Sequence, residues 1–424
     1  MASQSRPKVV IVGAGFGGLW AARSLSGAPA DVTLIDRHNY HTFFPLLYQV
    51  AAAELEPEDI AHPVRTILRR KSSVRFLMAD VTGLDLEAKC VRTSMGEVTY
   101  DYLVLATGSR PHFFGVRGAE EHALPLRALE EGVAVRNHIL TRFERASAMP
   151  PEQREGELSF AIVGGGPTGV EFAGALAELV YGPLHKDFPS LDFKQVSITV
   201  IEASDGLLTM LTPKLRLYTL RRLERMGVKV RLSTAVEEIT ADGVHLKGGE
   251  FVPAKTVVWT AGVRGHPDLQ AWGLPVARGG RIPVHPTLQL LEHDDVYVVG
   301  DAAYLEQDGR PLPMVAPTAT QQGAAAAGNI RRQIAGRAPE PFRYRDLGTL
   351  AVIGRNAAAA HVFGWNFSGF PAWLVWLVYH LYALIGFRNR LVVLTSWAWD
   401  YLFLERVVRL VLPSPGESSK SSHG

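Results

Sequence analysis

Cysteine is almost absent from this chain of 424 residues, since Cys90 is the only one. A single cysteine cannot form an internal disulfide, a redox-active cysteine pair or a thiolate zinc site. Enzyme classes that react through paired cysteines are therefore excluded. The sequence also has no clustered set of other metal ligands, so we expect no metal centre. Scarce cysteine is consistent with a reducing compartment.

An excess of charge of one sign is also missing. Lys and Arg number 44 and Asp and Glu number 42, which gives a net charge of +2. A nucleic-acid partner would require a clustered basic face, so we expect none. With 47% apolar residues, the chain is long enough for two or three domains with full cores. An expected strand from Val9 leaves no space for a signal peptide, so we expect the N-terminal part to stay in the cytoplasm.

The sequence contains the same supersecondary unit twice. An apolar run at 9–13 ends in a glycine turn, followed by a predicted helix over 18–25 and a strand over 32–35. The pattern returns as a strand over 160–163, a glycine turn, a helix over 168–180 and a strand over 197–201. Strand, glycine turn, helix and strand form a βαβ unit of a parallel sheet. The sequence predicts an α/β protein with two Rossmann-like domains.

The first glycine turn has the spacing of a dinucleotide fingerprint, with glycines at 13, 15 and 18. In such a turn the first glycine permits the tight bend, the second lets the backbone approach a pyrophosphate, and the third allows close helix–strand packing. Asp36 ends the second strand, where its carboxylate can accept the ribose hydroxyls of an adenosine. Because a glycine-rich turn alone can be only a turn, the complete order of elements supports the prediction of a binding site.

The second turn repeats the spacing with Gly164, Gly166 and Gly169, and Glu202 ends its second strand. A carboxylate there accepts a ribose 2′-hydroxyl and repels a 2′-phosphate, so we expect NADH rather than NADPH. A solvated acid at a strand end is the alternative. An insertion at 182–193 explains the long interval before Glu202. Two fingerprints in one chain indicate hydride transfer between a nicotinamide and a second, resident dinucleotide.

Further motifs resemble the flavoproteins typified by glutathione reductase and ferredoxin reductases. Ala106-Thr107-Gly108 is similar to their linking motif, and the run 295–302 to their second FAD motif, in which Asp301 would bind the ribityl chain. The resemblance implies FAD at the first fingerprint and NADH at the second. It implies a discontinuous FAD-binding domain (1–115 and 265–340), an inserted NADH-binding domain (116–264), a C-terminal region (341–412) and a disordered tail (413–424).

Within these flavoproteins, the chain from about 8 to 412 resembles the type II NADH:quinone dehydrogenases, respiratory enzymes that pump no protons. The runs that carry the resemblance are 45–51, 136–140, 353–358 and 386–390. It implies an FAD-dependent oxidoreductase that passes a hydride from NADH to FAD, then two electrons and protons to a quinone. The same lack of a cysteine pair excludes disulfide reduction and sulfide:quinone reduction. Ubiquinone and menaquinone both remain open as the acceptor.

The resemblance also implies three catalytic residues. In the run 316–323, Pro317 replaces the first glutamine of the family's quinone motif, while Gln321 and Gln322 remain and would line the quinone pocket. Polar surface is the alternative for these glutamines. Glu171 would lie near the flavin–nicotinamide stack, although the helix dipole alone also favours a carboxylate in a first turn.

The sequence of the C-terminal region predicts that it contacts a membrane surface. The uncharged run 372–387 is shorter than the roughly 20 residues of a spanning helix, and 391–412 contains charged residues. We therefore expect helices that lie in the interface on the cytoplasmic face of the plasma membrane, with a spanning helix near 372–387 as the alternative. Aromatic residues that cover the protein's own core or a homodimer contact are another alternative. The residues expected at the lipid are Trp373, Trp376, Trp397, Trp399, Arg388 and Arg390.

Two other functions remain open. The first is a soluble NADH-dependent ferredoxin or rubredoxin reductase, against which the C-terminal aromatic residues and Gln321 and Gln322 count. The second is a flavin-based NADH sensor that turns over slowly with every acceptor.

Overall fold

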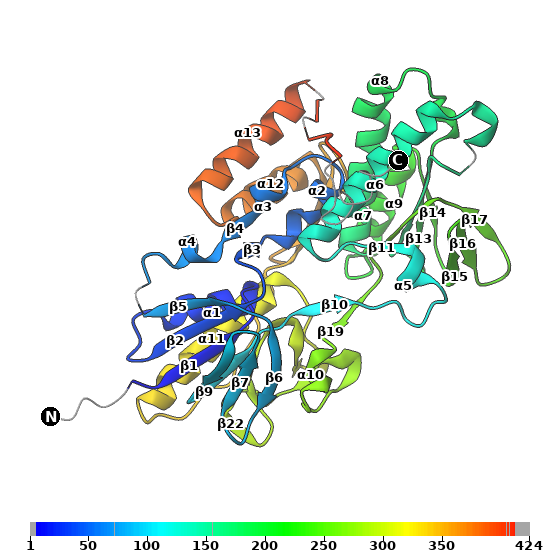
Figure 1. The fold of residues 1–424 in the computed structure, drawn as a ribbon. Coiled ribbons are helices and arrows are strands. Elements are labelled where there is room, and N and C mark those ends of the chain that lie inside the picture. Colours follow the sequence, from blue (N-terminus) through cyan, green and yellow to red (C-terminus); the bar gives the residue numbers. More distant parts are fainter. Residues whose placement is uncertain (1–5, 72, 155, 404, 407, 412–424) are drawn as a thin grey trace, which may run out of the picture. The chain divides into compact units, whose positions relative to one another are not determined.

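The computed structural model describes residues 6–71, 73–154, 156–403, 405–406 and 408–411 (Figure 1). The chain divides into two units, each assembled from three separate segments. Unit 1 consists of Met1–Thr42, Ala61–Arg110 and Val263–Leu347. Unit 2 consists of Phe43–Ile60, Pro111–Gly262 and Gly348–Gly424. The tail predicted at 413–424 lies outside the described residues.

A six-stranded sheet forms the centre of unit 1, in the order β21-β22-β9-β1-β2-β5. All neighbours pair in parallel except β21, which is antiparallel to β22. Its strands are β1 (Lys8–Val12), β2 (Asp31–Asp36), β5 (Val74–Met78), β9 (Tyr102–Leu105), β21 (Gln289–Leu290) and β22 (His293–Val298). Four consecutive buried residues in β1 reflect a sheet that is covered on both faces.

Helices and a small antiparallel sheet provide that cover. Helices α1 (Phe16–Leu25) and α11 (Ala316–Ile334) pack closely, and glycine at position 323 allows this. A Cβ there would lie only 2.1 Å from the Gly17 carbonyl oxygen. The small antiparallel sheet is β6-β7-β8, and its Val91 shares a hydrophobic core with Val10 and Val12 of β1. The bounds of that sheet are β6 (Val81–Asp85), β7 (Cys90–Thr93) and β8 (Gly96–Thr99).

Unit 2 has a five-stranded sheet of the same type, in the order β11-β18-β12-β13-β14, with all strands parallel. The strands are β11 (Ala123–Pro125), β12 (Ser159–Val163), β13 (Ser197–Ile201), β14 (Val228–Arg231) and β18 (Thr256–Trp259). The main helices are α6 (Leu129–Ala148), α7 (Pro167–Leu179) and α9 (Pro213–Arg225), and a second sheet contains β15 (Val236–Thr240), β16 (Gly243–Leu246) and β17 (Phe251–Pro253). The predicted α/β fold with two Rossmann-like parts is confirmed.

The C-terminal part of unit 2 begins as a sheet and ends as two helices (Figure 1). Its elements are β26 (Thr349–Val352), β27 (Ala358–Val362), β28 (Trp365–Gly369), α12 (Phe370–Ala383) and α13 (Phe387–Phe403). The alternative of a single spanning helix near 372–387 is not met, because α12 ends at Ala383. Across the described residues, no helix has the length and apolar character needed to cross a membrane.

Shorter elements connect these parts. In unit 1 they include β3 (Tyr40–Thr42), β4 (Ala61–Pro63), α4 (Val64–Leu68), β20 (Ile282–Pro283) and β23 (Ala303–Tyr304). In unit 2 they include α2 (Leu47–Ala51), α3 (Pro57–Ile60), α5 (Ala119–His122), a π-helical turn (Val180–Leu184) and α8 (His185–Asp187). The insertion predicted at 182–193 thus begins as a continuation of α7.

Candidate active site

The first glycine turn connects β1 to α1, and the packing around it demands glycine at two of its three positions. Gly13 has φ +101°, and a Cβ there would lie 2.3 Å from the Ala106 carbonyl oxygen. A Cβ on Gly18 would lie 1.8 Å from the Gly13 carbonyl oxygen. At Gly15, by contrast, a Cβ would meet no heavy atom within 4 Å. Gly13 and Gly18 therefore shape the turn, and Gly15 leaves open space beside the backbone.

Asp36 at the end of β2 is held against this turn. Its carboxylate accepts hydrogen bonds from the backbone N–H of Ala14 (2.6 Å) and of His38 (2.8 Å). Burial raises the pKa of Asp36, and the two N–H donors oppose that rise. The carboxylate is thus positioned before any ligand arrives.

The linking motif and the second FAD motif also meet in unit 1. Ala106 follows β9 and borders Gly13, while Gly108 has φ +71° with open space around it. Asp301 is buried just after β22 and accepts a hydrogen bond from the Ser109 hydroxyl at 2.6 Å. Residues 192 positions apart in sequence are thereby fixed to each other.

The second glycine turn, between β12 and α7 of unit 2, has the same construction. Gly164 has φ +115°, and a Cβ on Gly169 would lie 1.9 Å from the Gly164 carbonyl oxygen. Gly166 again has no heavy atom within 4 Å of a Cβ position. The Glu202 carboxylate accepts from the Gly165 N–H (2.5 Å) and the Ser204 N–H (2.7 Å). Both turns therefore hold an acidic side chain through the N–H of the residue after the first glycine.

Several buried polar atoms of unit 1 have no hydrogen-bond partner among the described residues. Four of them are His41 Nε2, Thr107 Oγ1, Thr318 Oγ1 and Gln322 Nε2. The glycine turn 13–18 and Asp36 are called the cradle of unit 1. His41 contacts this cradle, since its Nδ1 lies 2.9 Å from the Ala14 carbonyl oxygen and its ring packs edge-on against Phe16. Buried groups without partners are costly, so these atoms indicate a polar ligand. The residues present fit a flavin dinucleotide. His41 and Ser109 lie outside every sequence motif, so sequence patterns alone did not identify them as candidate site residues.

The two predicted quinone-pocket glutamines have different environments. Gln322 is fully buried, and its Oε1 accepts the N–H of Gly300 at 2.7 Å, which fixes the turn before Asp301. The side chain of Gln321 makes two 3.0 Å hydrogen bonds to the backbone of Arg345. Pro317 occupies the first turn of α11, where a missing N–H costs no helical hydrogen bond. Of the two glutamines, Gln322 is therefore the one that is hydrogen-bonded to the turn before Asp301.

Glu171 is buried in α7, where its carboxyl accepts the N–H of Val352 at 3.3 Å. Burial raises its pKa to about 8, against the opposing effect of that N–H and of the nearby Trp376 indole. Glu171 lines a cavity of about 910 Å³ among α2, α7, α12 and α13, all within unit 2. Its apolar wall includes Trp373, Trp376, Leu377, Leu381, Leu394 and Trp397.

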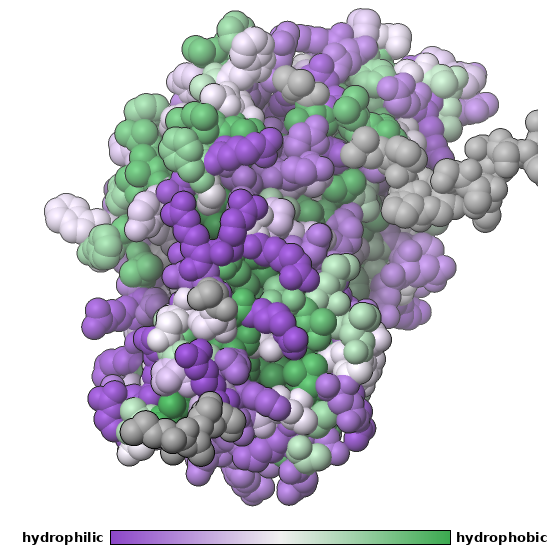
Figure 2. Space-filling model, turned by 60° about the vertical axis from the view of Figure 1, so that its left-hand side comes forward, coloured by the Kyte–Doolittle hydropathy of each residue, from purple (hydrophilic) through white to green (hydrophobic). Residues whose placement is uncertain are grey.

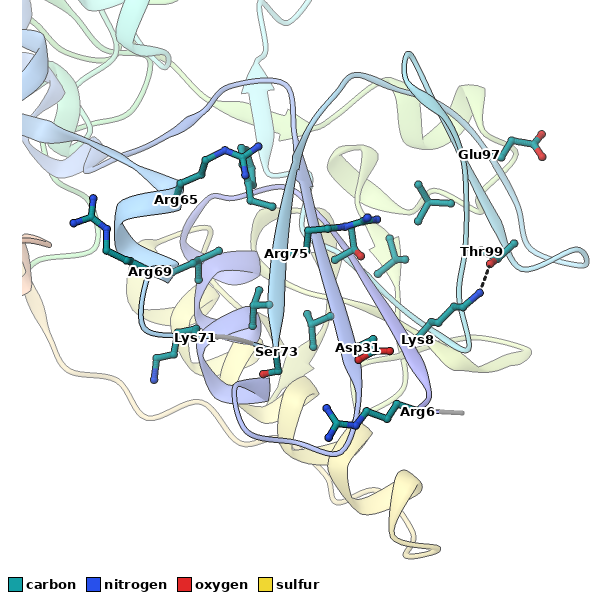
Figure 3. A pocket seen from close by; sticks show the side chains of 17 residues that line it. Arg6, Lys8, Asp31, Arg65, Arg69, Lys71, Ser73, Arg75, Glu97 and Thr99 are labelled. Carbon is teal, nitrogen blue, oxygen red and sulfur yellow. Dashed lines mark hydrogen bonds between the residues drawn. The ribbon is translucent and has the colours of Figure 1, made fainter. Parts of the chain in front are cut away.

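A second cavity, of about 860 Å³, lies in unit 1 near the amino ends of β1, β2 and β5 (Figure 3). Six basic side chains line it: Arg6, Lys8, Arg65, Arg69, Lys71 and Arg75. Dinucleotides in open α/β sheets bind outside the carboxyl ends of the strands, where Gly13 and Asp36 lie. This basic cavity is therefore not the dinucleotide site.

Comparison with known proteins agrees with this geometry. Residues 7–323 match the pyridine nucleotide-disulphide oxidoreductase family. A type II NADH:quinone oxidoreductase of Mycobacterium tuberculosis is 36% identical over 417 residues, which cover 95% of this chain and 89% of that protein. The chain belongs to the type II NADH:quinone oxidoreductases. The family predicted from the sequence motifs is confirmed.

Other type II NADH:quinone oxidoreductases extend the comparison. The enzyme of Staphylococcus aureus is 33% identical over 376 residues, which cover 87% of this chain and 92% of that protein. The solved structure of NDH2 from Plasmodium falciparum in complex with NADH has a TM-score of 0.87 and 19% identity, and covers 96% of this chain and all of that one. At that identity it supports the fold. FAD and NADH are the cofactors of the family, while the single buried Cys90 leaves no cysteine pair for disulphide chemistry.

Proposed function

We propose that this chain oxidises NADH and reduces a membrane quinone, with FAD bound in unit 1 and NADH in unit 2. The observation that carries the proposal is the twofold construction of the cradle. Each unit has an open second glycine (Gly15 or Gly166) beside an acid held by a backbone N–H. When bound, the flavin supplies the chemistry, because it accepts a hydride from a nicotinamide and releases electrons to a quinone.

The chain's own residues bind and orient these groups. Asp36 and Glu202 accept ribose hydroxyls, and the charge of Glu202 repels a 2′-phosphate. The N-termini of α1 and α7 present free N–H groups to the two pyrophosphates. Asp301, fixed by Ser109, accepts hydrogen bonds from a ribityl chain. We also assign Ala106 and Gly108 to the FAD site, and we propose that Gln322 lies beside this site.

We assign the quinone to the cavity of about 910 Å³ in unit 2. Its indole and leucine side chains suit an apolar molecule, and Glu171 provides a carboxyl group in the same cavity. With its pKa raised to about 8, that carboxyl is protonated at neutral pH and can donate a proton to a quinone oxygen.

The Glu171 assignment predicts a pH dependence. Its carboxyl loses the proton as the pH rises through about 8, so quinone reduction should slow at higher pH. Glu171→Gln should reduce the rate about 10-fold or more at pH 7 and make this high-pH fall less steep. Stopped-flow reoxidation of the reduced protein by a short-chain quinone, from pH 6 to 9.5, measures both effects. An unchanged rate and slope would remove Glu171 from the mechanism.

The outer faces of α12 and α13 supply the membrane contact in this proposal. Their exposed apolar residues outside the cavity lining are Phe370, Val375, Tyr379, Tyr382, Phe387, Leu391, Trp399 and Phe403. Figure 2 shows apolar side chains on the left of the upper half of the face it presents, and a second apolar group nearer its centre. Such patches are rare on soluble monomers and are typical of helices in a lipid interface.

Four of the residues expected at the lipid have other places in the structure. Trp373 and Trp397 line the cavity of unit 2. Trp376 is only 1% exposed and stacks on His380 in the core of unit 2, so its assignment to the interface is wrong. Arg390 donates to the carbonyl oxygens of Tyr382 and Leu384, where it joins α13 to the end of α12. The sequence could not distinguish Trp376 from the exposed residues of α12, because no residue of that helix carries a charged side chain of Asp, Glu, Lys or Arg.

Membrane contact is testable by adding charge to α12. Phe370→Glu with Tyr382→Glu, at side chains 52% and 77% exposed and outside the cavity lining, should move most of the protein from vesicles into the supernatant. Met95→Glu, at a 72% exposed side chain of unit 1, is the control and should stay bound. Co-sedimentation with anionic vesicles measures the difference. A double variant that still sediments fully would contradict the lipid assignment, and sedimentation velocity would then test whether a second copy covers this face.

The acceptor separates the proposal from its alternatives. Purified protein should oxidise NADH rapidly with short-chain quinones and slowly with ferredoxin or rubredoxin. Rapid ferredoxin reduction without quinone reduction would favour the soluble reductase, and slow turnover with every acceptor would favour the sensor. We further propose attachment at the cytoplasmic face of the membrane, where NADH is available.

A further inference from the structure

Quinone reduction requires a proton that NADH does not supply. The overall reaction is NADH + quinone + H⁺ → NAD⁺ + quinol. One of the two hydroxyl protons of the quinol therefore comes from water. A group in the quinone cavity has to deliver this proton, and its assignment rests on the proposed function.

Glu54 is a second carboxyl group in the cavity that contains Glu171. The chain reaches it through Ala53, which has φ +56°, and the Glu54 N–H is held by the Gln49 carbonyl oxygen at 2.8 Å. This turn after α2 directs the Glu54 side chain inward, where it is 11% exposed. Tyr48 lines the same cavity, and burial raises its pKa, with a smaller contribution from the charges of Glu171 and Glu54.

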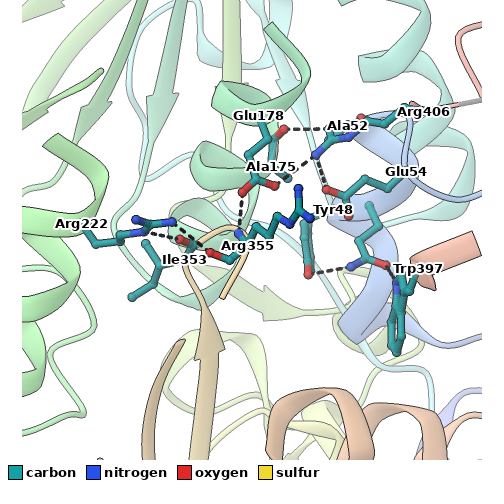
Figure 4. A network of polar contacts seen from close by, with 11 residues as sticks. Tyr48, Ala52, Glu54, Ala175, Glu178, Arg222, Ile353, Arg355, Trp397 and Arg406 are labelled. Atoms are coloured by element: carbon teal, nitrogen blue, oxygen red, sulfur yellow. Dashed lines mark hydrogen bonds and ion pairs between the residues drawn. The ribbon is translucent and has the colours of Figure 1, made fainter. Parts of the chain in front are cut away.

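Arg406 fixes the Glu54 carboxyl from the segment after α13 (Figure 4). The arginine side chain is 2% exposed, and its Nη1 donates at 2.8 Å to the carbonyl oxygens of Ala52 and Ala175. Its Nη2 lies 2.5 Å from Glu54 Oε1 and 3.4 Å from Glu178 Oε2. The sequence predicted 391–412 as an interfacial helix, but α13 ends at Phe403 and Arg406 is buried in unit 2.

One guanidinium is thus shared by Glu54 and Glu178, and the Asp400 carboxyl is nearby. The charges of Arg406, Arg222 and Arg355 act on these three carboxyls, yet burial raises the pKa of each, so part of this group holds protons. Burial raises the pKa of Glu54 to about 8, while Arg406 lowers it and Glu178 and Asp400 raise it. The other basic groups that line the cavity are His185, Lys186, Arg222 and Arg355.

Two of these cations make their hydrogen bonds elsewhere, although the charge of Arg222 also lowers the pKa of Glu178 and that of Arg355 lowers the pKa of Asp400. The Arg222 guanidinium donates to the carbonyl oxygens of Ile353 and Arg355. The Arg355 guanidinium lies over the Tyr401 ring and donates to the Tyr401 carbonyl oxygen. In the described part of the chain, Arg406 is the only cation in an ion pair with Glu54.

A polar chain holds the wall beside Glu54 in place. The Trp397 indole N–H donates to Gln49 Oε1 at 2.9 Å, and Gln49 Nε2 donates to the Tyr48 hydroxyl at 3.0 Å (Figure 4). These bonds connect α13 to α2. None of these hydrogen bonds involves the Glu54 carboxyl, which lies just after α2.

We propose that Glu54 donates one of the two quinone protons and that Arg406 positions it. The Glu54 O–H bond breaks as a quinol O–H bond forms, and the carboxylate remains beside Arg406. Glu171 donates the other proton. One of these two carboxyls is reprotonated by the proton that entered as hydride with NADH, and the other takes a proton from water.

Glu54→Gln tests the proposal, because the amide keeps the size of the side chain and can still accept from Arg406. We expect turnover with quinone to fall about 10-fold or more at pH 7, with the quinone KM and the rate of flavin reduction by NADH unchanged. With both carboxyls required, the logarithm of the wild-type rate should fall with a slope near −2 above pH 8. Either single glutamine variant should show a slope near −1. Glu157→Gln is the matched control, a buried carboxylate paired with Arg142 at 2.9 Å outside the cavity.

Arg406→Gln provides an independent measurement if the Glu54 variant folds poorly. Because Arg406 lowers the pKa of Glu54, its removal should raise that pKa by about one unit, while Glu171 still titrates near pH 8. The slope between pH 8 and 9 should therefore change from near −2 to near −1. Unchanged turnover and slope in Glu54→Gln, or an unchanged slope between pH 8 and 9 in Arg406→Gln, would overturn the assignment of Glu54. Wild-type protein that reduces no quinone would instead overturn the proposed function, and the Glu54 proposal with it.

Discussion

Gly166→Val should leave the protein yellow but nearly unable to take a hydride from NADH. No heavy atom lies within 4 Å of a Cβ at position 166, so the folded chain accommodates the side chain. The backbone there is extended (φ −73°, ψ −175°), which valine adopts readily and which suits the residue before Pro167. The added methyl groups occupy the space through which a pyrophosphate approaches the turn. Flavin reduction at low NADH should slow at least about 100-fold, or about 2.8 kcal/mol.

Stopped-flow absorbance of the flavin measures this loss, and dithionite provides the control. Dithionite should bleach the variant as it bleaches the wild type, because the cradle of unit 1 is unchanged. Full FAD content shows that the fold is retained. Normal reduction by low NADH in such a protein would place the nicotinamide elsewhere.

Gly15→Val should have the complementary effect, namely loss of FAD. Gly15 also has no heavy atom within 4 Å of its Cβ position and an extended backbone (φ −69°, ψ −165°). The valine side chain would occupy the pyrophosphate position of unit 1, so we expect FAD affinity to fall at least about 100-fold. The protein should purify colourless, with the far-UV circular dichroism of the wild type.

Two other glycines provide the comparison. Gly328→Ala on α11, where a Cβ also meets no atom, should keep its flavin. Gly18→Ala should destabilise the fold itself, since its Cβ would lie 1.8 Å from the Gly13 carbonyl oxygen. A yellow Gly15→Val protein with full FAD would contradict the cradle assignment.

The sequence predicted the parts of this molecule that depend on neighbouring residues. A glycine turn, its helix and the strand-end acid occur within about 40 residues, and each glycine position has a local steric reason. The strands expected at 160–163 and 197–201 are β12 and β13 within one residue. The repeated order of elements made the α/β fold predictable before any distance was known.

The cavity of unit 2 could not be predicted in this way. It joins Glu54, Glu171 and Arg406, which come from three distant segments, and no period or spacing connects them. Charged residues after α13 suggested solvent or lipid, yet Arg406 is buried because two carboxyl groups and two carbonyl oxygens meet it there. The segment Phe43–Ile60 also gave no sign that it belongs to unit 2.

Deleting the chain from about residue 363 would be an unsuitable test of membrane binding for the same reason. It would remove Ala372 and Trp376, which are buried in unit 2, and the ion pair of Arg406 with Glu54. Loss of membrane binding would then report unfolding. Charged substitutions on exposed positions of α12 avoid that problem.

The central claim is that one chain passes electrons from NADH through FAD to a quinone. Anaerobic titration of the purified yellow protein with NADH, followed by a short-chain quinone, tests it most directly. We predict that one equivalent of NADH per FAD bleaches the flavin and that one equivalent of quinone restores its colour. A flavin that NADH does not bleach, or that stays reduced after quinone is added, would contradict the claim.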